Sequence, residues 1–454
     1  MNDNSASPIS HSGPKGKLIT GNLREFKSDT VGFLSRMAKE YGEVARFRLG
    51  PFQRNYLITN PDLIKEILVT KSKYFVKSQE FSALKPMIGE GIFTSEKPLH
   101  TQQRKLIQPA FKRANIDNYA LDMIDITTDF ASTWQDGEER IATRDMMDIT
   151  LNIINKTMFS MDFKDGHHLI GKPLDVSMQM AVKRMRFVLR LPLWVPTKHN
   201  REYKKAVQSL DQVVYDIIEK RRSDEAVHED MLGILMDARD ENDGSGMSYN
   251  QIRDEVMTIF VAGHETTSTA LSWAFYLLSQ HPEVEKKLHE ELDSAIGSRM
   301  PVPGDFKKLT YTQNIVWEAL RLYPPAFIYG RRAIEDVEIG GYPFKKGDTL
   351  MLSQYLMHRS EKYFDNPDSF IPERFENNFM KTLPLFAFFP FGGGPRVCIG
   401  NHFAMMEAVF VIACIAKRYR LRLAPDHHEV KMLPHLTLRP RRGLRMIVEE
   451  RKNI

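Results

Sequence analysis

A glycine-rich loop that contains a cysteine holds the residue types most capable of chemistry in this sequence. It spans residues 391–400 and reads FGGGPRVCIG, and an apolar stretch with helical spacing follows it. A cysteine binds a metal as its thiolate, which needs a positive environment, and a helix N-terminus offers backbone N–H groups and a partial positive charge. Cys398 is therefore a candidate thiolate ligand, and the glycines would let a flat ligand approach the backbone closely.

The spacing of this loop excludes phosphate ligands. A dinucleotide-binding fingerprint requires a glycine three places after its second glycine, where this chain has Val397. A Walker loop requires lysine and then serine or threonine, but Asn401 and His402 follow Gly400. If the flat ligand is a haem, a thiolate ligand would donate electron density to its iron and favour O–O cleavage. The alternative for a cysteine before an apolar helix is a buried structural residue, which is our interpretation of Cys414.

A second segment, AGHETT, places an acid beside an alcohol within a long helical pattern. A carboxyl group next to a hydroxyl group can deliver protons to a reacting centre, so Glu265 and Thr266 are candidate catalytic residues. Alternatively, the Thr266 hydroxyl bonds back to the carbonyl of Ala262, as is common within helices. The pair His264-Glu265 also begins a zinc-protease helix, but that helix needs a second histidine where Ser268 stands.

Mostly helical elements must position these residues. The long helix begins at a capping box formed by Ser248 and Gln251 and runs to about Ser279. Further helices are expected from Pro282 onward, after Pro98, over residues 312–322 and over residues 401–418. Strand-like runs lie near residues 44–49, 55–59, 337–339 and 349–352, and within residues 421–448. The pattern therefore predicts a mainly α fold with a small β component.

Length and composition favour one large unit. The chain has 454 residues and no internal repeat or long linker, which predicts a single domain over residues 21–454. Residues 1–20 are polar, and we expect them to form a flexible tail without a signal peptide or membrane anchor. The most apolar run elsewhere, residues 408–416, is far shorter than the roughly 20 residues that cross a bilayer.

Charge and cysteine content limit the partners and the compartment. The chain has 63 Lys+Arg against 58 Asp+Glu, and the basic residues are spread along it, so we expect no nucleic-acid partner. Its two cysteines cannot build a disulfide framework and fit a reducing cytosol. These features predict a soluble, cytoplasmic protein.

The cysteine loop resembles that of the cytochrome P450 haem-thiolate monooxygenases, which has the form Phe-x-x-Gly-x-Arg-x-Cys-x-Gly. Phe391, Gly394, Arg396, Cys398 and Gly400 match every fixed position. The resemblance, which extends from about residue 20 to the end, implies a mainly α, triangular fold with a small β subdomain and haem b (iron protoporphyrin IX) as cofactor. It also implies that Cys398 is the proximal iron ligand, that Phe391 shields it and that Arg396 pairs with a haem propionate.

The AGHETT segment is similar to the oxygen-binding segment of the same family. The resemblance implies that Thr266 holds dioxygen or a water molecule and that Glu265 passes protons inward. Gly263 weakens a helix by about 1 kcal/mol relative to alanine. We therefore expect a local opening of the helix at Gly263 that makes room for dioxygen.

Other basic and acidic residues match structural and haem-contacting positions of the family. Glu318 and Arg321 share one helix face, and the resemblance implies that they form a buried network with Arg374, although such spacing is also common in weak surface pairs. His100 and Arg104 are four apart, so both can point toward a haem propionate. A further propionate contact is implied for Arg331, with the neighbouring Arg332 as the alternative.

The position of the motifs also suggests the substrate pocket. The resemblance implies an apolar lining formed by Phe93, Ala262, Ala326, Phe327, Ile328, Leu436 and Thr437, with further residues from 178–191. Such a lining suits a fatty acid, a terpenoid or a steroid-like molecule. Some bacterial fatty-acid hydroxylases of the family bind the carboxylate through an arginine of the first sheet. The approximate register puts Phe52 there with Arg54 close by, which weakens the fatty-acid interpretation.

The implied function is that of a stand-alone, bacterial-type monooxygenase and hydroxylase, expected to be monomeric. No flavin or ferredoxin module follows the cysteine loop, so a ferredoxin or flavodoxin with its reductase should supply the electrons. A basic face would suit such an acidic partner, and its candidate residues are Arg104, Lys105, Lys112, Arg113 and Lys417.

Two other functions are considered. One is a haem-thiolate ligand-binding or sensor protein without turnover, and the other is a peroxide-driven peroxygenase. Glu265 and Thr266 argue against a sensor, which has no need of proton delivery. The peroxygenases of the family usually replace this acid–alcohol pair with arginine and proline.

Overall fold

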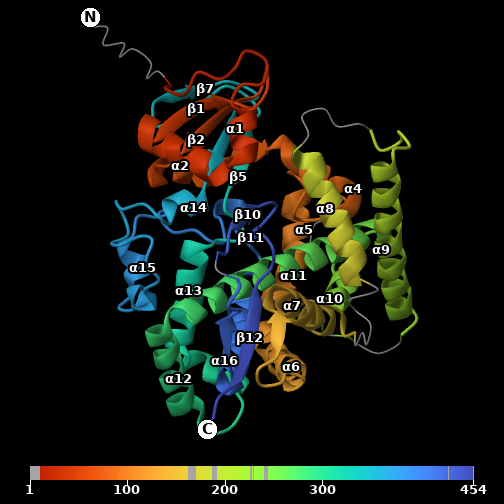
Figure 1. Ribbon diagram of the computed structural model, residues 1–454. Helices are drawn as coiled ribbons and strands as arrows, with labels where there is room; N and C mark the ends of the chain where they lie inside the picture. Colours follow the sequence, from red (N-terminus) through yellow and green to blue (C-terminus); the bar gives the residue numbers. More distant parts are fainter. Residues whose placement is uncertain are drawn as a thin grey trace, which may run out of the picture. The chain divides into compact units, whose positions relative to one another are not determined.

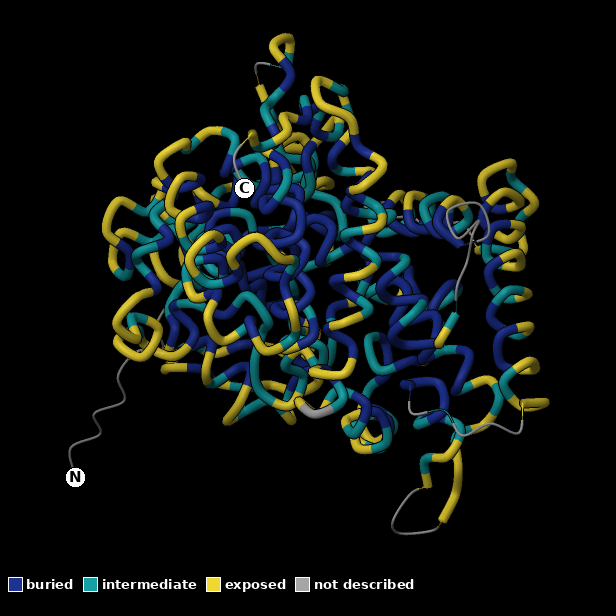
Figure 2. The backbone as a smooth tube through the Cα atoms, turned by 90° about the horizontal axis from the view of Figure 1, so that it is seen from below, coloured by how far each residue is buried: buried dark blue, intermediate teal, exposed yellow. Residues whose placement is uncertain are grey.

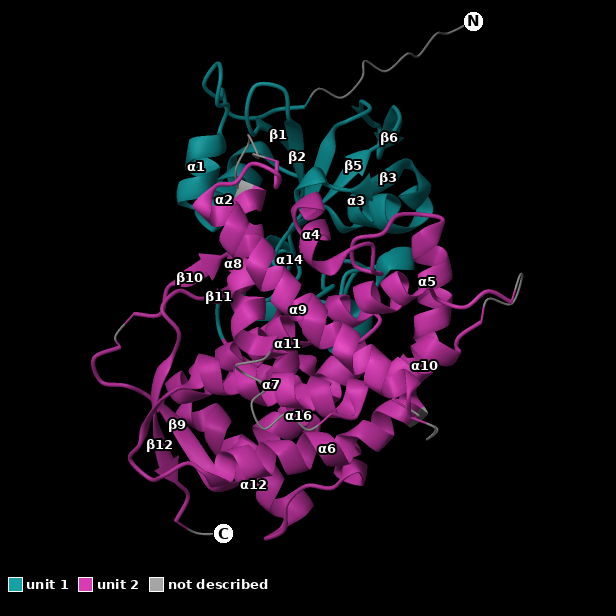
Figure 3. Cartoon of the chain, turned by 90° about the vertical axis from the view of Figure 1, so that its right-hand side faces the viewer, with its two compact units in different colours: residues 1–80, 321–369, 377–398 teal, residues 81–320, 370–376, 399–454 magenta. Residues whose placement is uncertain are grey.

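The computed structural model describes residues 11–161, 170–186, 192–224, 228, 230–239, 244–427 and 429–452. These residues form two compact units, shown in different colours in Figure 3. Unit 1 is built from residues 1–80, 321–369 and 377–398, and unit 2 from residues 81–320, 370–376 and 399–454. These compact units are defined by their internal contacts, and the single domain over residues 21–454 stays a prediction.

A five-stranded sheet organises unit 1 (Figure 1). Its strands lie in the order β1 (Val44–Arg48), β2 (Arg54–Ile58), β8 (Thr349–Leu352), β5 (Tyr329–Ala333) and β3 (Phe75–Lys77). β2 and β8 are parallel neighbours, and the other pairs are antiparallel. Parallel strands inside a sheet are buried on both faces, which explains why their apolar runs are nearly continuous.

Apolar side chains cover both faces of this sheet. Successive side chains of a strand point to opposite faces, so Leu57 packs in a cluster with α2 (Thr30–Tyr41). Its neighbours Tyr56 and Ile58 pack in a second cluster, which includes Phe344. Burial on both sides fixes the register of β2, because a slip by one residue would exchange the two faces.

The remaining elements of unit 1 are short. They are α1 (Leu23–Ser28), α3 (Pro61–Lys65), α14 (Gln354–Met357), α15 (Phe379–Thr382) and the paired strands β6 (Val337–Ile339) and β7 (Tyr342–Phe344). The predicted N-terminal tail is described from residue 11 onward. This part contacts β1, where the Arg46 N–H donates to the Ser12 carbonyl at 2.7 Å.

Helices dominate unit 2, and α11 (Tyr249–Gln280) packs against many of the others. The other helices are α4 (Lys85–Ile88), α5 (Leu99–Ile107), α6 (Arg113–Ser132), α7 (Ala142–Phe159), α8 (Lys172–Arg186), α9 (Lys198–Arg222), α10 (Met231–Asp237), α12 (Pro282–Ile296), α13 (Thr310–Leu322), which ends in unit 1, and α16 (Asn401–Arg418). One small sheet has the order β4 (Glu139–Ile141), β12 (Arg445–Glu450), β9 (Tyr419–Leu423). A second pairs β10 (Met432–Pro434) with β11 (Leu438–Pro440). None of the helices in the described ranges is both long and apolar enough to span a bilayer.

The long helix α11 is buried on nearly every side, in contrast to the exposed turns coloured yellow in Figure 2. It starts at the predicted capping box, in which the side chains of Ser248 and Gln251 each accept a backbone N–H of the other residue. It ends at Gln280, two residues before Pro282, which occupies the first turn of α12, where proline is tolerated. Tight burial extends to Trp273, whose indole N–H donates to the Leu438 carbonyl at 2.7 Å.

A buried carboxylate joins α13 to the short segment 370–376 in unit 2. Glu318 is fully buried and accepts the Ile371 N–H at 3.0 Å. Its Oε1 atom also lies 3.5 Å from Nε of Arg374, whose side chain is almost fully buried. A buried charge requires such partners, because removal from water is costly for an isolated ion.

The next turn of α13 carries a second buried charge, Arg321, which binds segments of unit 1. Its guanidinium donates to the carbonyl oxygens of His358 at 2.9 Å, Pro367 at 2.5 Å and Ser369 at 3.0 Å. It also lies 5.3 Å from the centre of the Phe364 ring. Arg321 therefore ties the chain between residues 358 and 369 to the end of α13.

Replacing Glu318 by glutamine should destabilise the protein, because Arg374 would then remain buried beside a neutral amide. Breaking a buried ion pair costs about 3–5 kcal/mol, and we expect a matching fall in the midpoint of urea unfolding followed by circular dichroism. As a control, Asp336→Asn removes the exposed pair with Lys345 and should cost less than about 1 kcal/mol. Equal effects of the two changes would contradict the structural role of Glu318.

Candidate functional site

The cysteine loop is folded back on itself by backbone hydrogen bonds. The Cys398 N–H donates to the Phe391 carbonyl at 2.9 Å, and the Val397 N–H donates to the Gly394 carbonyl at 3.1 Å. Cys398 itself is exposed, and α16 begins three residues later, as the sequence predicts. Within the described ranges, no three His, Cys, Asp or Glu side chains gather where they could hold a metal ion. A zinc site with four protein ligands is therefore excluded there, whereas Cys398 can offer a single thiolate ligand.

The glycines of this loop are required by its own packing. Gly394 has φ of +66°, and a Cβ atom there would lie 1.9 Å from the Leu68 carbonyl oxygen. A Cβ atom on Gly393 would lie 2.1 Å from a ring carbon of Phe386. The sequence suggested that these glycines allow a flat ligand to approach closely. At these two positions they instead allow close packing against other residues of unit 1.

Tyr329 and Arg331 of β5 provide a polar pair next to the loop. The Tyr329 hydroxyl is buried, has no hydrogen-bond partner among the described residues, and lies 3.7 Å from where a Cβ atom on Gly392 would be. The guanidinium carbon of Arg331 lies 4.8 Å from the Tyr329 ring centre. Burial raises the pKa of the Tyr329 phenol to about 12, and Arg331 opposes this shift, so the phenol keeps its proton at neutral pH.

These residues fit the carboxylates of a haem. A buried phenol with unused donor capacity and a neighbouring guanidinium suit an anionic acceptor. Arg331 is half-buried, whereas the alternative Arg332 is exposed, so its surroundings favour Arg331 for such a contact. Phe391 and Arg396 of the loop are also half-buried in the same unit.

Glu265 of α11 is buried and meets a second predicted residue in unit 2. The Thr437 hydroxyl donates to Oε1 of Glu265 at 2.7 Å. Burial raises the pKa of the Glu265 carboxyl, and the hydrogen bond from Thr437 and the charge of Arg439 act against this shift. Thr437, expected to line a pocket, is therefore a hydrogen-bond partner of the candidate proton carrier.

Thr266 shows the local hydrogen bond considered from the sequence. Its hydroxyl donates to the Ala262 carbonyl at 2.6 Å, and both residues are half-buried on one face of α11. The expected opening at Gly263 is wrong, because α11 is a continuous helix through this residue. A Cβ atom on Gly263 would lie 2.6 Å from Cδ1 of Ile154, so this glycine allows close packing of α7.

Glu407 of α16 is a buried acid that was not predicted from the sequence as a site residue. It is fully buried, and burial raises the pKa of its carboxyl well above the usual value, against the effect of the Thr267 hydroxyl on α11. Its signal in the sequence is a single acid inside an apolar helix, which is rare unless the acid has a partner. Like Glu265, Glu407 is therefore a buried carboxyl group at α11.

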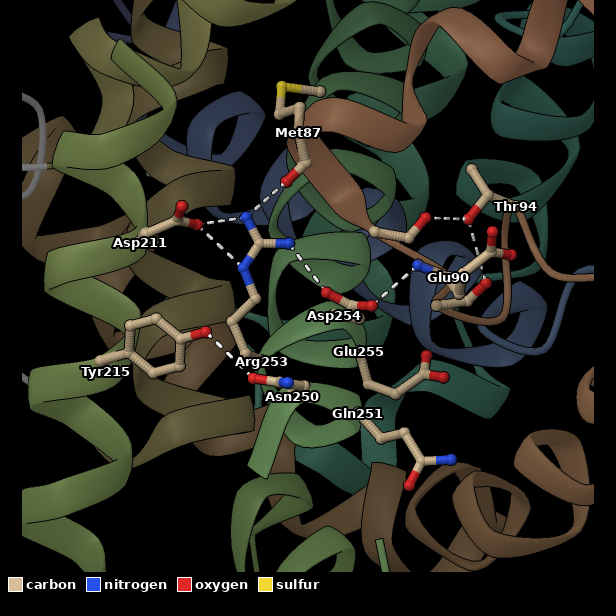
Figure 4. A network of polar contacts seen from close by, with 12 residues as sticks. Met87, Glu90, Thr94, Asp211, Tyr215, Asn250, Gln251, Arg253, Asp254 and Glu255 are labelled. Carbon is tan, nitrogen blue, oxygen red and sulfur yellow. Dashed lines mark hydrogen bonds and ion pairs between the residues drawn. The ribbon is translucent and has the colours of Figure 1, made fainter. Parts of the chain in front are cut away.

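Three successive charged residues of α11 hold the segment that precedes Phe93 (Figure 4). Arg253 donates to the Met87 carbonyl at 2.8 Å and pairs with Asp211 of α9. Asp254 accepts the Glu90 N–H at 2.8 Å. These contacts connect α9, α11 and the segment 87–90.

Glu255 continues this arrangement toward Phe93. Its Oε2 atom accepts the Ile92 N–H at 2.9 Å. Gly91 lies so close to α11 that a Cβ atom there would be 2.1 Å from the Thr258 hydroxyl oxygen. Phe93 follows directly, half-buried and edge-on to Phe81 with ring centres 5.6 Å apart. The position of this predicted pocket residue is therefore set by polar side chains of α11.

The other predicted residues of unit 2 lie on α5 and after β10. His100 and Arg104 are one turn apart on α5, with His100 buried and Arg104 half-buried. Leu436 lies half-buried in the turn between β10 and β11, next to Thr437. Gly400 caps the N-terminus of α16. Of the expected region 178–191, residues 187–191 lie outside the described residues.

The predicted pocket residues of unit 1 differ in exposure. Ala326 is exposed and Ile328 is half-buried against the cluster formed with α2. Phe327 is buried, and its carbonyl accepts from the Tyr355 N–H at 3.2 Å and the Ser353 hydroxyl at 3.0 Å. The side chain of Phe327 is therefore buried, and the hydrogen bonds to its carbonyl hold its backbone in unit 1.

One expectation about a surface position is wrong, whereas the register that puts Phe52 at the carboxylate-binding position stays a prediction. Phe52 is 92% exposed, and Arg54 is bound to the buried Asp348 at 2.5 Å. Lys417, assigned to a basic surface, is only 2% exposed and pairs with Asp293 at 3.0 Å. The sequence shows neither outcome, because both depend on partners far along the chain.

Comparison with known proteins identifies the family. The family model described as "Cytochrome P450" matches residues 12–447. Cyclooctatin synthase of Streptomyces melanosporofaciens is 33% identical over 96% of this chain and 95% of its own length.

Two further relatives are named as oxygenases. Cyclooctat-9-en-7-ol 5-monooxygenase of Streptomyces melanosporofaciens is 32% identical over 85% of this chain and 84% of its own length. Pentalenene oxygenase of Streptomyces avermitilis is 30% identical over 92% of both chains. With the match of the family model to nearly the whole sequence, the chain belongs to the cytochrome P450 family of monooxygenases.

Proposed function

We propose that this protein inserts one oxygen atom of O2 into a hydrophobic terpenoid, using haem b and electrons from separate redox partners. The observation that carries the proposal is the exposed Cys398 on a loop whose backbone is fixed by hydrogen bonds and glycine packing. When bound, the haem would supply the iron centre at which dioxygen is activated. Cys398 would hold the iron, and the propionate contacts proposed are His100, Arg104, Arg331 and Arg396. Phe391 and Gly400 would complete the binding loop.

A terpenoid is favoured over a fatty acid by two observations. Two relatives are named for cyclooctat-9-en-7-ol and pentalenene, an unsaturated alcohol and an alkene. In unit 1, the charge of Arg54 is already paired with the buried Asp348, which weakens its attraction for a substrate carboxylate. The proposed apolar contacts are those of Phe93, Ala262, Ala326, Phe327, Ile328 and Leu436.

We further propose that Glu265 and Thr266 control proton delivery. A buried carboxyl group with a raised pKa keeps its proton at a higher pH than an exposed acid and can release it to a reaction centre. Thr437 would orient this carboxyl through its hydrogen bond. Thr266 would exchange its bond to Ala262 for one to dioxygen or water. These roles favour a monooxygenase over a sensor or a peroxygenase.

The redox partner is proposed to be a ferredoxin or flavodoxin with its reductase, acting on a cytoplasmic, monomeric enzyme. Lys105, Lys112 and Arg113 are exposed, so these residues can present positive charge to an acidic partner, whereas Arg104 is half-buried and is proposed above as a propionate contact. Lys417 is not part of this face, because it is buried.

Replacing Cys398 by histidine should abolish the red-shifted Soret band of the reduced carbon monoxide complex, because this band requires a thiolate ligand. The control is Cys414→Ala, which should keep the band. Cys414 is buried in α16, and burial raises the pKa of its thiol to about 12. A Cys398→His protein that retained the band would disprove the assignment of the iron ligand.

Replacing Thr437 by valine should raise the pKa of Glu265, because the Thr437 hydrogen bond lowers it. If the protonated Glu265 delivers the proton, the decline of product formed per electron consumed at alkaline pH should move to higher pH. Thr437→Ser keeps the hydroxyl and should leave the profile in place. A profile unchanged in Thr437→Val would rule out control of Glu265 by Thr437.

Raising the salt concentration should slow reduction of the enzyme by an acidic ferredoxin, because salt screens attraction between exposed charges. Lys112→Glu should reduce the rate several-fold at low salt. Lys204→Glu, an exposed charge on α9, serves as the control and should have little effect. Equal rates at all salt concentrations would exclude docking by the proposed basic face.

A further inference from the structure

Three large apolar side chains are exposed on two turns of unit 1. Leu18 is 87% exposed, Ile19 is 72% exposed and Phe52 is 92% exposed. Leu18 and Ile19 precede α1, and Phe52 lies in the turn between β1 and β2. Single exposed apolar residues are common, but neighbouring ones usually mark an interaction site.

Backbone contacts hold these two turns side by side. The Gly50 N–H donates to the Thr20 carbonyl at 3.0 Å, and the Asn22 N–H donates to the Arg48 carbonyl at 2.7 Å. Gly21 is so close to the other turn that a Cβ atom there would lie 2.4 Å from the Arg48 oxygen. Leu18, Ile19 and Phe52 therefore belong to one surface, which we name the apolar tip.

Basic residues outnumber acidic ones in the two segments that carry the apolar tip. Residues 11–24 and 46–54 contain no aspartate or glutamate, and their basic residues are Lys15, Lys17, Arg24, Arg46, Arg48 and Arg54. Arg54 is paired with Asp348, whereas the other five form no ion pair with a carboxylate that the structure describes. The carboxylates beside these segments include Glu25, which follows Arg24, and Glu80, which accepts a hydrogen bond from the Gln53 side chain at 2.8 Å. The tip thus combines exposed apolar groups with a basic rim.

We propose that the apolar tip docks the protein on an anionic lipid surface. Apolar side chains that enter the headgroup region, together with lysine and arginine that attract anionic lipids, are the two elements of reversible interfacial binding. A second protein is a poorer occupant, because three side chains offer a few hundred Å² at most, against about 800 Å² that each partner contributes to a stable interface. Docking would bring the enzyme to the phase in which a hydrophobic substrate, the one proposed above, dissolves.

Flotation of the purified full-length protein with vesicles tests this proposal. Vesicles of phosphatidylcholine and phosphatidylglycerol should carry the protein, whereas vesicles of phosphatidylcholine alone should carry much less, and salt should weaken the binding. The variant Leu18→Ser/Phe52→Ser should bind the mixed vesicles at least about tenfold more weakly. Leu385→Ser removes a side chain that is 63% exposed elsewhere in unit 1, and it should bind like the parent protein.

The results of these experiments distinguish a lipid surface from a second copy of the protein as the partner of the apolar tip. Unfolding of the variants is checked by their melting temperatures, and Phe52→Ser alone replaces the double variant if that one does not fold. Absence of binding to the mixed vesicles, or equal loss in Leu385→Ser, overturns the proposal. Conversion of a dimer to a monomer by the tip variant, without any lipid binding, also overturns it and assigns the tip to contact between two copies. Failure of the enzyme assignment would leave the vesicle result unchanged.

Discussion

A helix that is buried on nearly every side needs partners for the charged side chains that it carries, and α11 is such a helix. Its partners come from distant parts of the sequence. Arg253 binds the Met87 carbonyl, Glu265 accepts from Thr437, and Trp273 donates to the Leu438 carbonyl. The polar groups of one helix thereby fix both the segment before Phe93 and the turn between β10 and β11.

This constraint gives the same side chains two tasks. Glu265 is a satisfied buried acid in the fold and the proton carrier in the proposed reaction. A carboxyl group in this position needs a donor such as Thr437 for the first task, and the same donor sets its pKa for the second. The cysteine loop also combines a role in the fold with a role in the proposed reaction. The Leu68 carbonyl leaves no room for a Cβ atom at position 394, so Gly394 is needed whether or not a haem lies nearby.

The sequence predicts features with local signals and misses those that depend on long-range packing. The capping box at Ser248, the bounds of α16 and the strands β1, β2, β6 and β8 were all visible as spacing or composition. β3, β4, β5 and β7 lacked a local signal that was strong enough. The role of Gly263 depends on α7, and the burial of Lys417 depends on Asp293, so neither could be read from neighbours in the chain.

The division of the chain also has a consequence for recombination between relatives. The backbone passes from one compact unit to the other after residues 80, 320, 369, 376 and 398. If two related sequences are joined at a single point within one of these segments, the core of that unit contains residues from both parents. A chimera that changes parent at all of these boundaries takes the whole core of each unit from one parent. A chimera made from one half of each parent cannot do so.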